Sequence, residues 1–188
     1  MSKDGGLLGL TLTCRYHYPG VTNNITVSLE TYTKLAAHPN IVGCKMSHGV
    51  VSHHVQVSLD PAIDHDKFRV YSGFGQQLGP IVFFGAAGVI DGLAAIYPRT
   101  VSRLFELASQ RPITEENLKQ IHKLQFSVSR AEEFVGRWGI VGIKEAVYRV
   151  LNIGNLDGGR LPLKGKLPDG EWEKWSVATD AMKSLEES

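Results

Sequence analysis

The sequence predicts an α/β fold of parallel strands followed by C-terminal helices, and three observations indicate it. Short apolar segments alternate with helical segments four times over residues 10–110. Turn or capping residues separate these segments, and beyond residue 111 the spacing of apolar residues is helical only. Alternating strands and helices imply parallel strands joined by right-handed crossovers, as in an α/β sheet or part of a β/α barrel.

The first strand is expected over residues 7–18, LLGLTLTCRYHY, an apolar, threonine-rich and aromatic segment that stops at Pro19. We expect this strand to be buried. Ser28 is suited to cap the helix that follows, because its hydroxyl can accept a hydrogen bond from a free backbone N–H. That helix ends at Pro39, and residues 41–45, IVGCK, form a short apolar strand that ends at a lysine.

Two more strands follow in the same rhythm. A helix is predicted over residues 50–58, and the strand FRVYS covers residues 68–72. Next come a short helix at residues 77–85, QLGPIVFFG, and a buried strand at residues 86–91, AAGVID. An amphipathic helix that begins at Thr100 completes the fourth strand and helix pair.

The C-terminal part is predicted to be helical. Thr114 is expected to cap a helix that reaches Trp138, and a second helix is predicted over residues 141–151. Lys144 lies in that second helix, where we expect it to be structural or solvated. A segment rich in Gly, Pro and charge then leads to a final amphipathic stretch.

Composition limits the classes of partner. The 188 residues are 43% hydrophobic and 21% charged, as in an ordinary soluble domain. Twenty Lys and Arg residues against nineteen Asp and Glu residues leave a net charge of +1, which argues against nucleic acid and an anionic membrane as partners. Cys14 and Cys44 lack metal or disulfide spacing, so both are expected to be reduced and buried. A cytoplasmic location is expected, and a mitochondrial one stays open.

Functional groups of parallel α/β folds gather at the carboxyl ends of the strands. Lys45 stands out there, because it ends a five-residue apolar strand. In a restricted interior, burial favours the neutral amine, which can attack a ketone and form an imine. The alternative is a strand-end lysine that simply reaches solvent.

Four motifs in order resemble one family. They are YHYPGVT at residues 16–22, IVGCKMSHG at residues 41–49, Ser72-Gly73, and GAAGVI at residues 85–90. This series resembles the C-terminal portion of the dihydrodipicolinate synthase and N-acetylneuraminate lyase family, the class I pyruvate-dependent aldolases. In that family a Tyr-x-x-Pro motif ends barrel strand five and a lysine closes strand six a little under thirty residues later. Here the interval from Tyr16 to Lys45 is 29 residues.

The resemblance implies a (β/α)8 TIM barrel of which only strands five to eight are present, followed by C-terminal helices. It implies three parts: an unrelated or altered lead-in at residues 1–9, the C-terminal half of a barrel at 10–110, and a helical extension and tail at 111–188.

The resemblance also implies a reaction, a Schiff-base lyase acting on a small 2-oxo acid. Lys45 would form the imine, Tyr16 would transfer protons, and the carbonyl of Gly73 and the apolar surface of Ile90 would line the lysine. No cofactor is expected, because the imine on Lys45 is the electron sink. The candidates for hydrogen bonds to the substrate, for which turn or capping roles are at least as well supported, are Thr22, Ser47 and His48.

Departures from the family pattern bear on the substrate. Dihydrodipicolinate synthases usually carry an arginine two residues after the motif proline, and Val21 cannot make its bidentate carboxylate contact. We therefore favour cleavage of a pyruvate-yielding substrate, such as a 2-oxo-3-deoxy sugar acid or 4-hydroxy-2-oxoglutarate. Dihydrodipicolinate synthase-type condensation is the alternative. His17 in place of asparagine, and Asn23-Asn24 in place of glycine, leave the loop geometry open.

The resemblance leaves strands one to four without a counterpart, and four parallel strands cannot close a barrel. We expect a truncated product, or a second copy that supplies the other half, and a catalytically silent half-barrel is a separate hypothesis. Family members are often tetramers, so a homo-oligomer is one expected assembly. A flavodoxin-like nucleotide binder is disfavoured by the absence of a glycine-rich strand-to-helix fingerprint. A metal site is not expected, since adjacent His53 and His54 should point to different helix faces.

Overall fold

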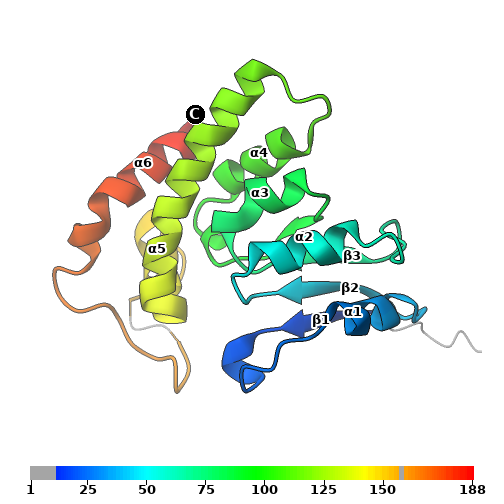
Figure 1. The fold of residues 1–188 in the computed structure, drawn as a ribbon. Coiled ribbons are helices and arrows are strands. Elements are labelled where there is room, and N and C mark those ends of the chain that lie inside the picture. Colours follow the sequence, from blue (N-terminus) through cyan, green and yellow to red (C-terminus); the bar gives the residue numbers. More distant parts are fainter. Residues whose placement is uncertain (1–11, 157–158) are drawn as a thin grey trace, which may run out of the picture.

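The computed structural model describes residues 12–156 and 159–188, in which four parallel strands pair in chain order (Figure 1). The strands are β1 (Thr13–His17), β2 (Ile41–Met46), β3 (Arg69–Ser72) and β4 (Gly88–Val89). The α-helices are α1 (Leu29–Ala36), α2 (Val51–Leu59), α3 (Leu78–Phe83), α4 (Pro98–Ser109), α5 (Glu115–Leu151) and α6 (Ser176–Glu187). Short 3-10 helices lie at η1 (Pro19–Val21), η2 (Gly75–Gln77), η3 (Leu93–Ala95) and η4 (Trp172–Trp175).

The register of the sheet brings the strand ends together at one edge. Tyr16 on β1 is opposite Lys45 on β2, and Lys45 is opposite Tyr71 on β3. Ser72 at the end of β3 is opposite Val89 at the end of β4. Because the strands are parallel, the loops that follow them open on the same side, and in Figure 1 the arrow of β2 points toward α5.

Two helices cover one face of β1 to β3. α1 and α2 pack over a buried cluster that includes Tyr32, Cys44, Met46, Val57 and Phe68. Side chains alternate across a strand, so the burial of Cys44 and Met46 beneath the helices places the intervening Lys45 on the opposite face. The Lys45 side chain therefore lies on the face of the sheet that α1 and α2 do not cover, which we call the inward face.

The other helices form a second and larger core. Buried residues of α3, α4, α5 and α6 pack together there, among them Leu78, Leu104, Val128 and Met182. The predicted caps are confirmed, since Ser28 and Thr114 each accept a backbone N–H in the first turn of α1 and α5. In a further contact, the Glu186 carboxylate of α6 accepts hydrogen bonds from the backbone N–H groups of Arg99 and Thr100 at the start of α4.

The long helix α5 replaces the two helices predicted at residues 114–138 and 141–151. Gly139 interrupts it with non-helical backbone angles, φ 53° and ψ −142°, at the predicted boundary. Lys144 is exposed on this helix, as expected.

Burial of the first strand was predicted wrongly. Thr13 to Tyr16 are exposed, and β1 is an edge strand that pairs only with β2 among residues 12–156 and 159–188. Cys14 and Tyr16 lie on the same face of the sheet as Lys45, away from α1 and α2. Cys14 is exposed for the same reason, whereas Cys44 is buried as predicted. β4 is also shorter than the predicted strand at 86–91. The predicted strand residues 7–11, and the lead-in at 1–9, lie outside the described residues.

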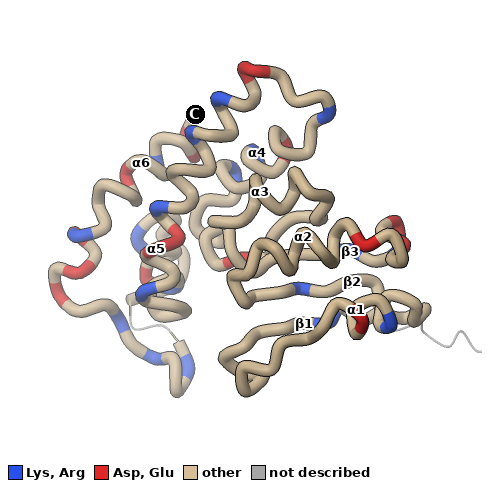
Figure 2. Tube along the Cα trace, in the orientation of Figure 1, with Lys and Arg blue, Asp and Glu red and all other residues tan. Residues whose placement is uncertain are grey.

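Charge is mixed over the described surface. Figure 2 shows Lys and Arg interspersed with Asp and Glu along α5 and α6. None of the described helices combines the length and apolar character that a membrane crossing requires.

Candidate active site

Lys45 and Tyr16 are cross-strand neighbours at the centre of the site. The Lys45 Nζ lies 4.4 Å from the centroid of the Tyr16 ring. The Tyr16 ring in turn stacks on Tyr18, with centroids 5.9 Å apart and 5° between the planes. Lys45 is half-buried, and 52% of Tyr16 is exposed, so the pair is open to a small solute.

Ser47 and Gly73 complete the surroundings of this pair. The Ser47 hydroxyl is buried and donates a hydrogen bond to the Tyr16 hydroxyl over 3.3 Å. A β-carbon built on Gly73 would collide with Ser47 Oγ and lie 3.3 Å from Lys45 Cε. Only glycine therefore leaves Lys45 and Ser47 in their present positions, and the backbone of the loop after β3 lies directly against the lysine side chain.

Thr22 and Ile90 lie farther out on two loops. The Thr22 hydroxyl donates to the carbonyl of Tyr18 over 3.1 Å, which is the turn role left open by the sequence. Ile90 follows β4, and its N–H donates to the carbonyl of Ser72 over 2.9 Å. The Ile90 side chain is 51% exposed, so within the described residues it leaves the strand ends open to water.

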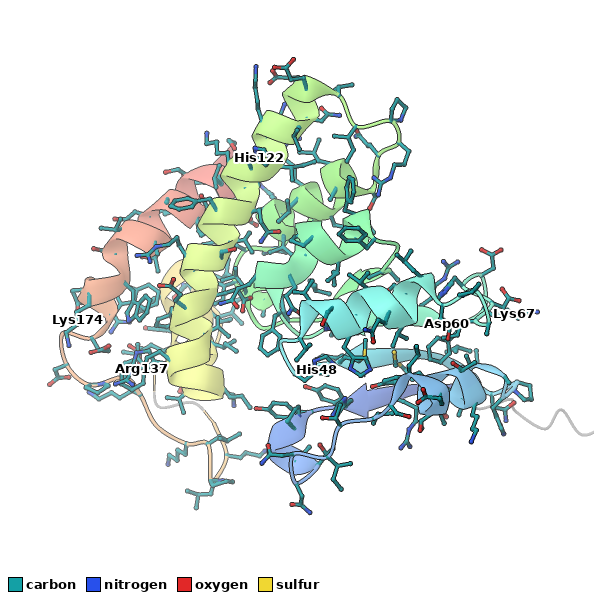
Figure 3. All side chains as sticks on the ribbon, viewed as in Figure 1. His48, Asp60, Lys67, His122, Arg137 and Lys174 are labelled. Carbon is teal, nitrogen blue, oxygen red and sulfur yellow. The ribbon has the colours of Figure 1, made fainter. Side chains whose placement is uncertain are left out.

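His48 belongs to a cluster of imidazole rings beside the start of α2 (Figure 3). Its ring centroid lies 5.0 Å from that of His53 and 5.1 Å from those of His17 and His54. The His48 ring therefore contacts both of the adjacent residues His53 and His54, and His53 also meets the ring of Tyr32. His17 also bonds the hydroxyl of Tyr32.

The ionisation of this histidine cluster is set mainly by burial. Burial, then the neighbouring His53 and His17, lower the pKa of His48 to about 4. Burial, then His48 and His53, lower the pKa of His54 to about 4. Nδ1 of His48 accepts the N–H of Val50 over 3.0 Å, so in the neutral ring Nε2 carries the proton and is a free donor.

Metal binding finds no support in the described geometry. Over residues 12–156 and 159–188, no group of three or more His, Cys, Asp or Glu side chains is arranged to hold an ion. Packed imidazole rings are thus a different arrangement from a ligand shell, whose nitrogen atoms converge on one point.

Two acidic residues near the site, the half-buried Asp91 and the buried Glu132, were not among the site residues predicted from the sequence. Asp91 follows Ile90 at the end of β4, and Glu132 comes from the middle of α5. Both approach Gly75 in the loop after β3. Burial raises the pKa of both groups, and the proximity of Asp91 adds to the rise at Glu132. Nothing in the local sequence around Glu132 indicates this contact, because it arises from the packing of α5.

The fold and the site together define a class of protein. The chain carries part of a parallel β/α architecture in which a strand-end lysine faces a tyrosine on the neighbouring strand. The model of the Dihydrodipicolinate synthetase family matches residues 13–150, and the chain belongs to this family. The predicted family is therefore confirmed.

Two curated relatives are similar in sequence. The chain is 28% identical over 132 residues to "Probable 4-hydroxy-2-oxoglutarate aldolase, mitochondrial" from Emericella nidulans, with 70% of this chain and 40% of the relative covered. It is 27% identical over 154 residues to L-threo-3-deoxy-hexylosonate aldolase from Hypocrea jecorina, with 79% and 47% covered. The chain thus spans less than half the length of these curated relatives.

One solved structure is also similar to this chain over only part of its own length. Dihydrodipicolinate synthase from Acinetobacter baumannii, complexed with pyruvate, is similar with a TM-score of 0.77 and 26% identity, over 91% of this chain and 55% of that chain. Such neighbours are TIM-barrel proteins, so the described sheet and helices correspond to part of a β/α barrel, and the predicted fold class is confirmed.

Proposed function

We propose that this chain carries the imine-forming site of a class I aldolase that acts on 2-oxo acids. The observation that supports this most directly is Lys45 Nζ lying over the Tyr16 ring, beside Ser47 and Gly73. The reaction needs no metal, because the imine formed on Lys45 accepts the electrons of the bond that breaks. The substrate would be a small 2-oxo acid.

Imine formation begins with the neutral amine. Lys45 Nζ attacks the ketone carbon of the substrate, and the ketone oxygen takes up a proton to give a carbinolamine. Loss of that hydroxyl as water leaves a protonated imine. Tyr16 would donate and accept these protons, a role supported by the hydrogen bond from Ser47 that holds its hydroxyl at the same strand end as Lys45.

Cleavage then uses the positive imine as an electron sink. Tyr16 removes the proton from the hydroxyl at C4 of the substrate, and a carbonyl forms there as the C3–C4 bond breaks. The bonding electrons move into the imine and give an enamine. The aldehyde leaves, C3 takes up a proton, and water hydrolyses the resulting pyruvate imine and frees Lys45.

The substrate class is inferred from one side chain and from the relatives. Val21 is 73% exposed on η1 and offers no charge to a second carboxylate. The two relatives are named as a probable 4-hydroxy-2-oxoglutarate aldolase and an L-threo-3-deoxy-hexylosonate aldolase. We favour cleavage of such pyruvate-yielding acids over condensation of the dihydrodipicolinate synthase type. Thr22, Ser47 and His48 remain the candidates for hydrogen bonds to the substrate.

Borohydride trapping tests this function. The 188-residue chain is incubated with pyruvate and sodium borohydride, and the intact mass is measured. Lys45→Ala should abolish the adduct, and Lys144→Ala, which removes an exposed lysine from a similar Gly-x-Lys motif, should leave it unchanged. The proposal is supported if the wild type and Lys144→Ala form the adduct and Lys45→Ala does not.

The remaining outcomes separate the alternatives. A folded wild-type chain without an adduct would contradict the proposal and favour a catalytically silent half-barrel. Where trapping succeeds, release of pyruvate from 4-hydroxy-2-oxoglutarate or a 2-oxo-3-deoxy sugar acid supports the lyase. Consumption of pyruvate only with aspartate semialdehyde supports the condensation instead. The cytoplasmic location and a homo-oligomeric assembly stay predictions.

A further inference from the structure

The two buried carboxyls beside Gly75 meet at one point behind the proposed imine site. A β-carbon built on Gly75 would overlap Asp91 Oδ2 and would lie 2.9 Å from Glu132 Oε1. Both side chains are largely buried, and Glu132 is only 3% exposed. Glycine at position 75 is therefore what allows the two carboxyls to approach each other.

Both carboxyls at this point have an oxygen that a shared proton would satisfy. Asp91 Oδ2 and Glu132 Oε1 are each buried without a donor from the described part of the chain. Two ionised carboxylates against the same glycine would repel each other in a poorly solvated place. If one of the two acids keeps its proton, its O–H donates to the other carboxylate, and neither oxygen is left unpaired.

The pair joins three segments of the chain. Asp91 Oδ1 accepts the N–H of Ala94 over 2.9 Å, so Asp91 fixes the start of η3. Glu132 belongs to a row on α5 that contacts the loop after β3: Gln125 Nε2 donates to the carbonyl of Gly75 over 3.0 Å, and Val128 packs against Gly75. The loops that carry Gly73 and Ile90 are thereby both held against α5.

We propose that Asp91 and Glu132 share one proton and act as positioning residues, which hold the loops after β3 and β4 in the arrangement that Lys45 needs for imine formation. This inference rests on the proposed function. It adds a contribution from α5 to a site that is otherwise built from strand ends. The shared proton is the part of the inference that can be tested without any turnover.

The charge of the pair depends on pH. The charged groups that act on the two carboxyls are each other and Lys45 on β2. The Lys45 charge lowers the pKa of Asp91 against the larger effect of burial, which raises it. Burial, then Asp91, raises the pKa of Glu132 to about 8, so the pair carries one negative charge at neutral pH and two in alkali. The two charges then repel each other in a poorly solvated place, which weakens the hold of the pair on the loops after β3 and β4.

Two substitutions at Glu132 separate the proton from the packing. Glu132→Gln keeps a neutral donor to Asp91, and Glu132→Leu removes the donor while filling a similar space. Glu133→Gln is the matched control, because the neighbouring Glu133 is exposed and pairs with Arg130. We expect the borohydride trapping rate at pH 7 to stay within about threefold in Glu132→Gln and to fall at least about tenfold in Glu132→Leu.

The pH profile gives a readout that a purely structural role would not change. Between pH 7 and 9 the trapping rate of the wild type should fall relative to that of Glu132→Gln by about threefold or more, because only the wild type gains the second negative charge. Parallel profiles, or a Glu132→Leu chain that traps as fast as the wild type, would overturn the positioning role.

Carboxyl carbon NMR on a chain labelled with ¹³C-glutamate tests the pair apart from the proposed function. One glutamate should titrate far above the ordinary value of about 4.3, and its signal should vanish in Glu132→Gln but persist in Glu133→Gln. If every glutamate titrates in the ordinary range, the shared proton is refuted. A wild type that traps no pyruvate contradicts the proposed function and the positioning role with it, and the NMR titration still decides the shared proton.

Discussion

The hydroxyl of Ser47, the residue after β2, donates to the Tyr16 hydroxyl on β1 over 3.3 Å, so a polar contact joins the carboxyl ends of the two strands that carry the proposed imine site. This contact restrains the position of the phenolic oxygen. A tyrosine that is 52% exposed would otherwise sample several positions. The same hydroxyl that anchors Tyr16 therefore holds it over Lys45.

Removing the phenolic oxygen tests the proton-transfer role of Tyr16. We expect Tyr16→Phe to slow imine trapping roughly 100-fold, because a positioned acid and base is lost while the ring over Lys45 remains. Thermal unfolding should change little, since the side chain is half exposed. Tyr18→Phe is the control, because its exposed ring stacks on Tyr16, and an equal loss in both variants would refute a specific role for Tyr16.

A side chain at position 73 should disturb the site directly. Gly73→Ala places a β-carbon against Ser47 and close to Lys45, and we expect it to cost about 1–3 kcal/mol of unfolding free energy and to suppress trapping. Urea denaturation and trapping rates measure the two effects. Gly136→Ala, at an exposed helical site with no neighbour near the new carbon, should be neutral or stabilising. Combining Gly73→Ala with Ser47→Gly should recover part of the lost stability, and no recovery would contradict the steric explanation.

The sequence could predict the strands, the helix caps and the residues at the strand ends because these depend on local patterns. Lys45 follows an apolar run, and Ser28 and Thr114 precede helical ones. The exposure of Cys14 could not be predicted in this way. Its neighbours resemble a buried strand, and only the pairing of β1 with β2 alone leaves its inward face uncovered.

The buried polar groups depend on contacts between distant segments. Asp91 and Glu132 meet because α5 packs against η2 and η3, and His48 meets His17 because β1 lies beside β2. Local sequence carries no signal for either contact. The single residue that could have drawn attention to the carboxyl pair is Gly75, whose lack of a side chain is required there.

The histidine cluster should make stability depend on pH. The pKa of His54 in the folded chain is about 4, below the ordinary value of about 6.5, so its contribution is fully present above pH 6.5 and is lost as the pH falls toward 4. Relative to the wild type, His54→Leu should gain roughly 1.4 kcal/mol of unfolding free energy for each pH unit below 6.5. Glu132, whose pKa is raised, lowers the unfolding free energy as the pH rises from 4.5 to 8, which opposes the effect of His54. The difference in unfolding free energy between His54→Leu and the wild type removes this contribution of Glu132.

Chemical denaturation at pH 7.5, 6.0 and 5.0 measures this difference. His122→Leu is the control for the histidine-to-leucine change itself, because His122 is exposed on α5 (Figure 3) and outside the histidine cluster. An offset for His54→Leu that does not vary with pH would show that His54 does not titrate with a lowered pKa.

A third buried acid, Glu145, should hold the C-terminal segment on α5. Its carboxylate accepts hydrogen bonds from Arg149 Nε over 2.8 Å and from the backbone N–H of Leu167 over 2.6 Å. Glu145 is only 3% exposed. Glu145→Leu leaves the Leu167 N–H without a partner, and we expect it to cost about 2–3 kcal/mol of unfolding free energy. Loss of this anchor should also speed tryptic cleavage after Lys164 and Lys166.

The matched control is Glu133→Leu, which removes an exposed acid from the same helix. Its ion pair with Arg130 is solvated, so the change in unfolding free energy should stay below about 1 kcal/mol and the cleavage rate should not change. Glu145→Gln should lie between the two, because its amide oxygen can still accept from Leu167 while the charge opposite Arg149 is lost. Equal cleavage rates in Glu145→Leu and the wild type would mean that the tail is held by the apolar contacts of Leu167 alone.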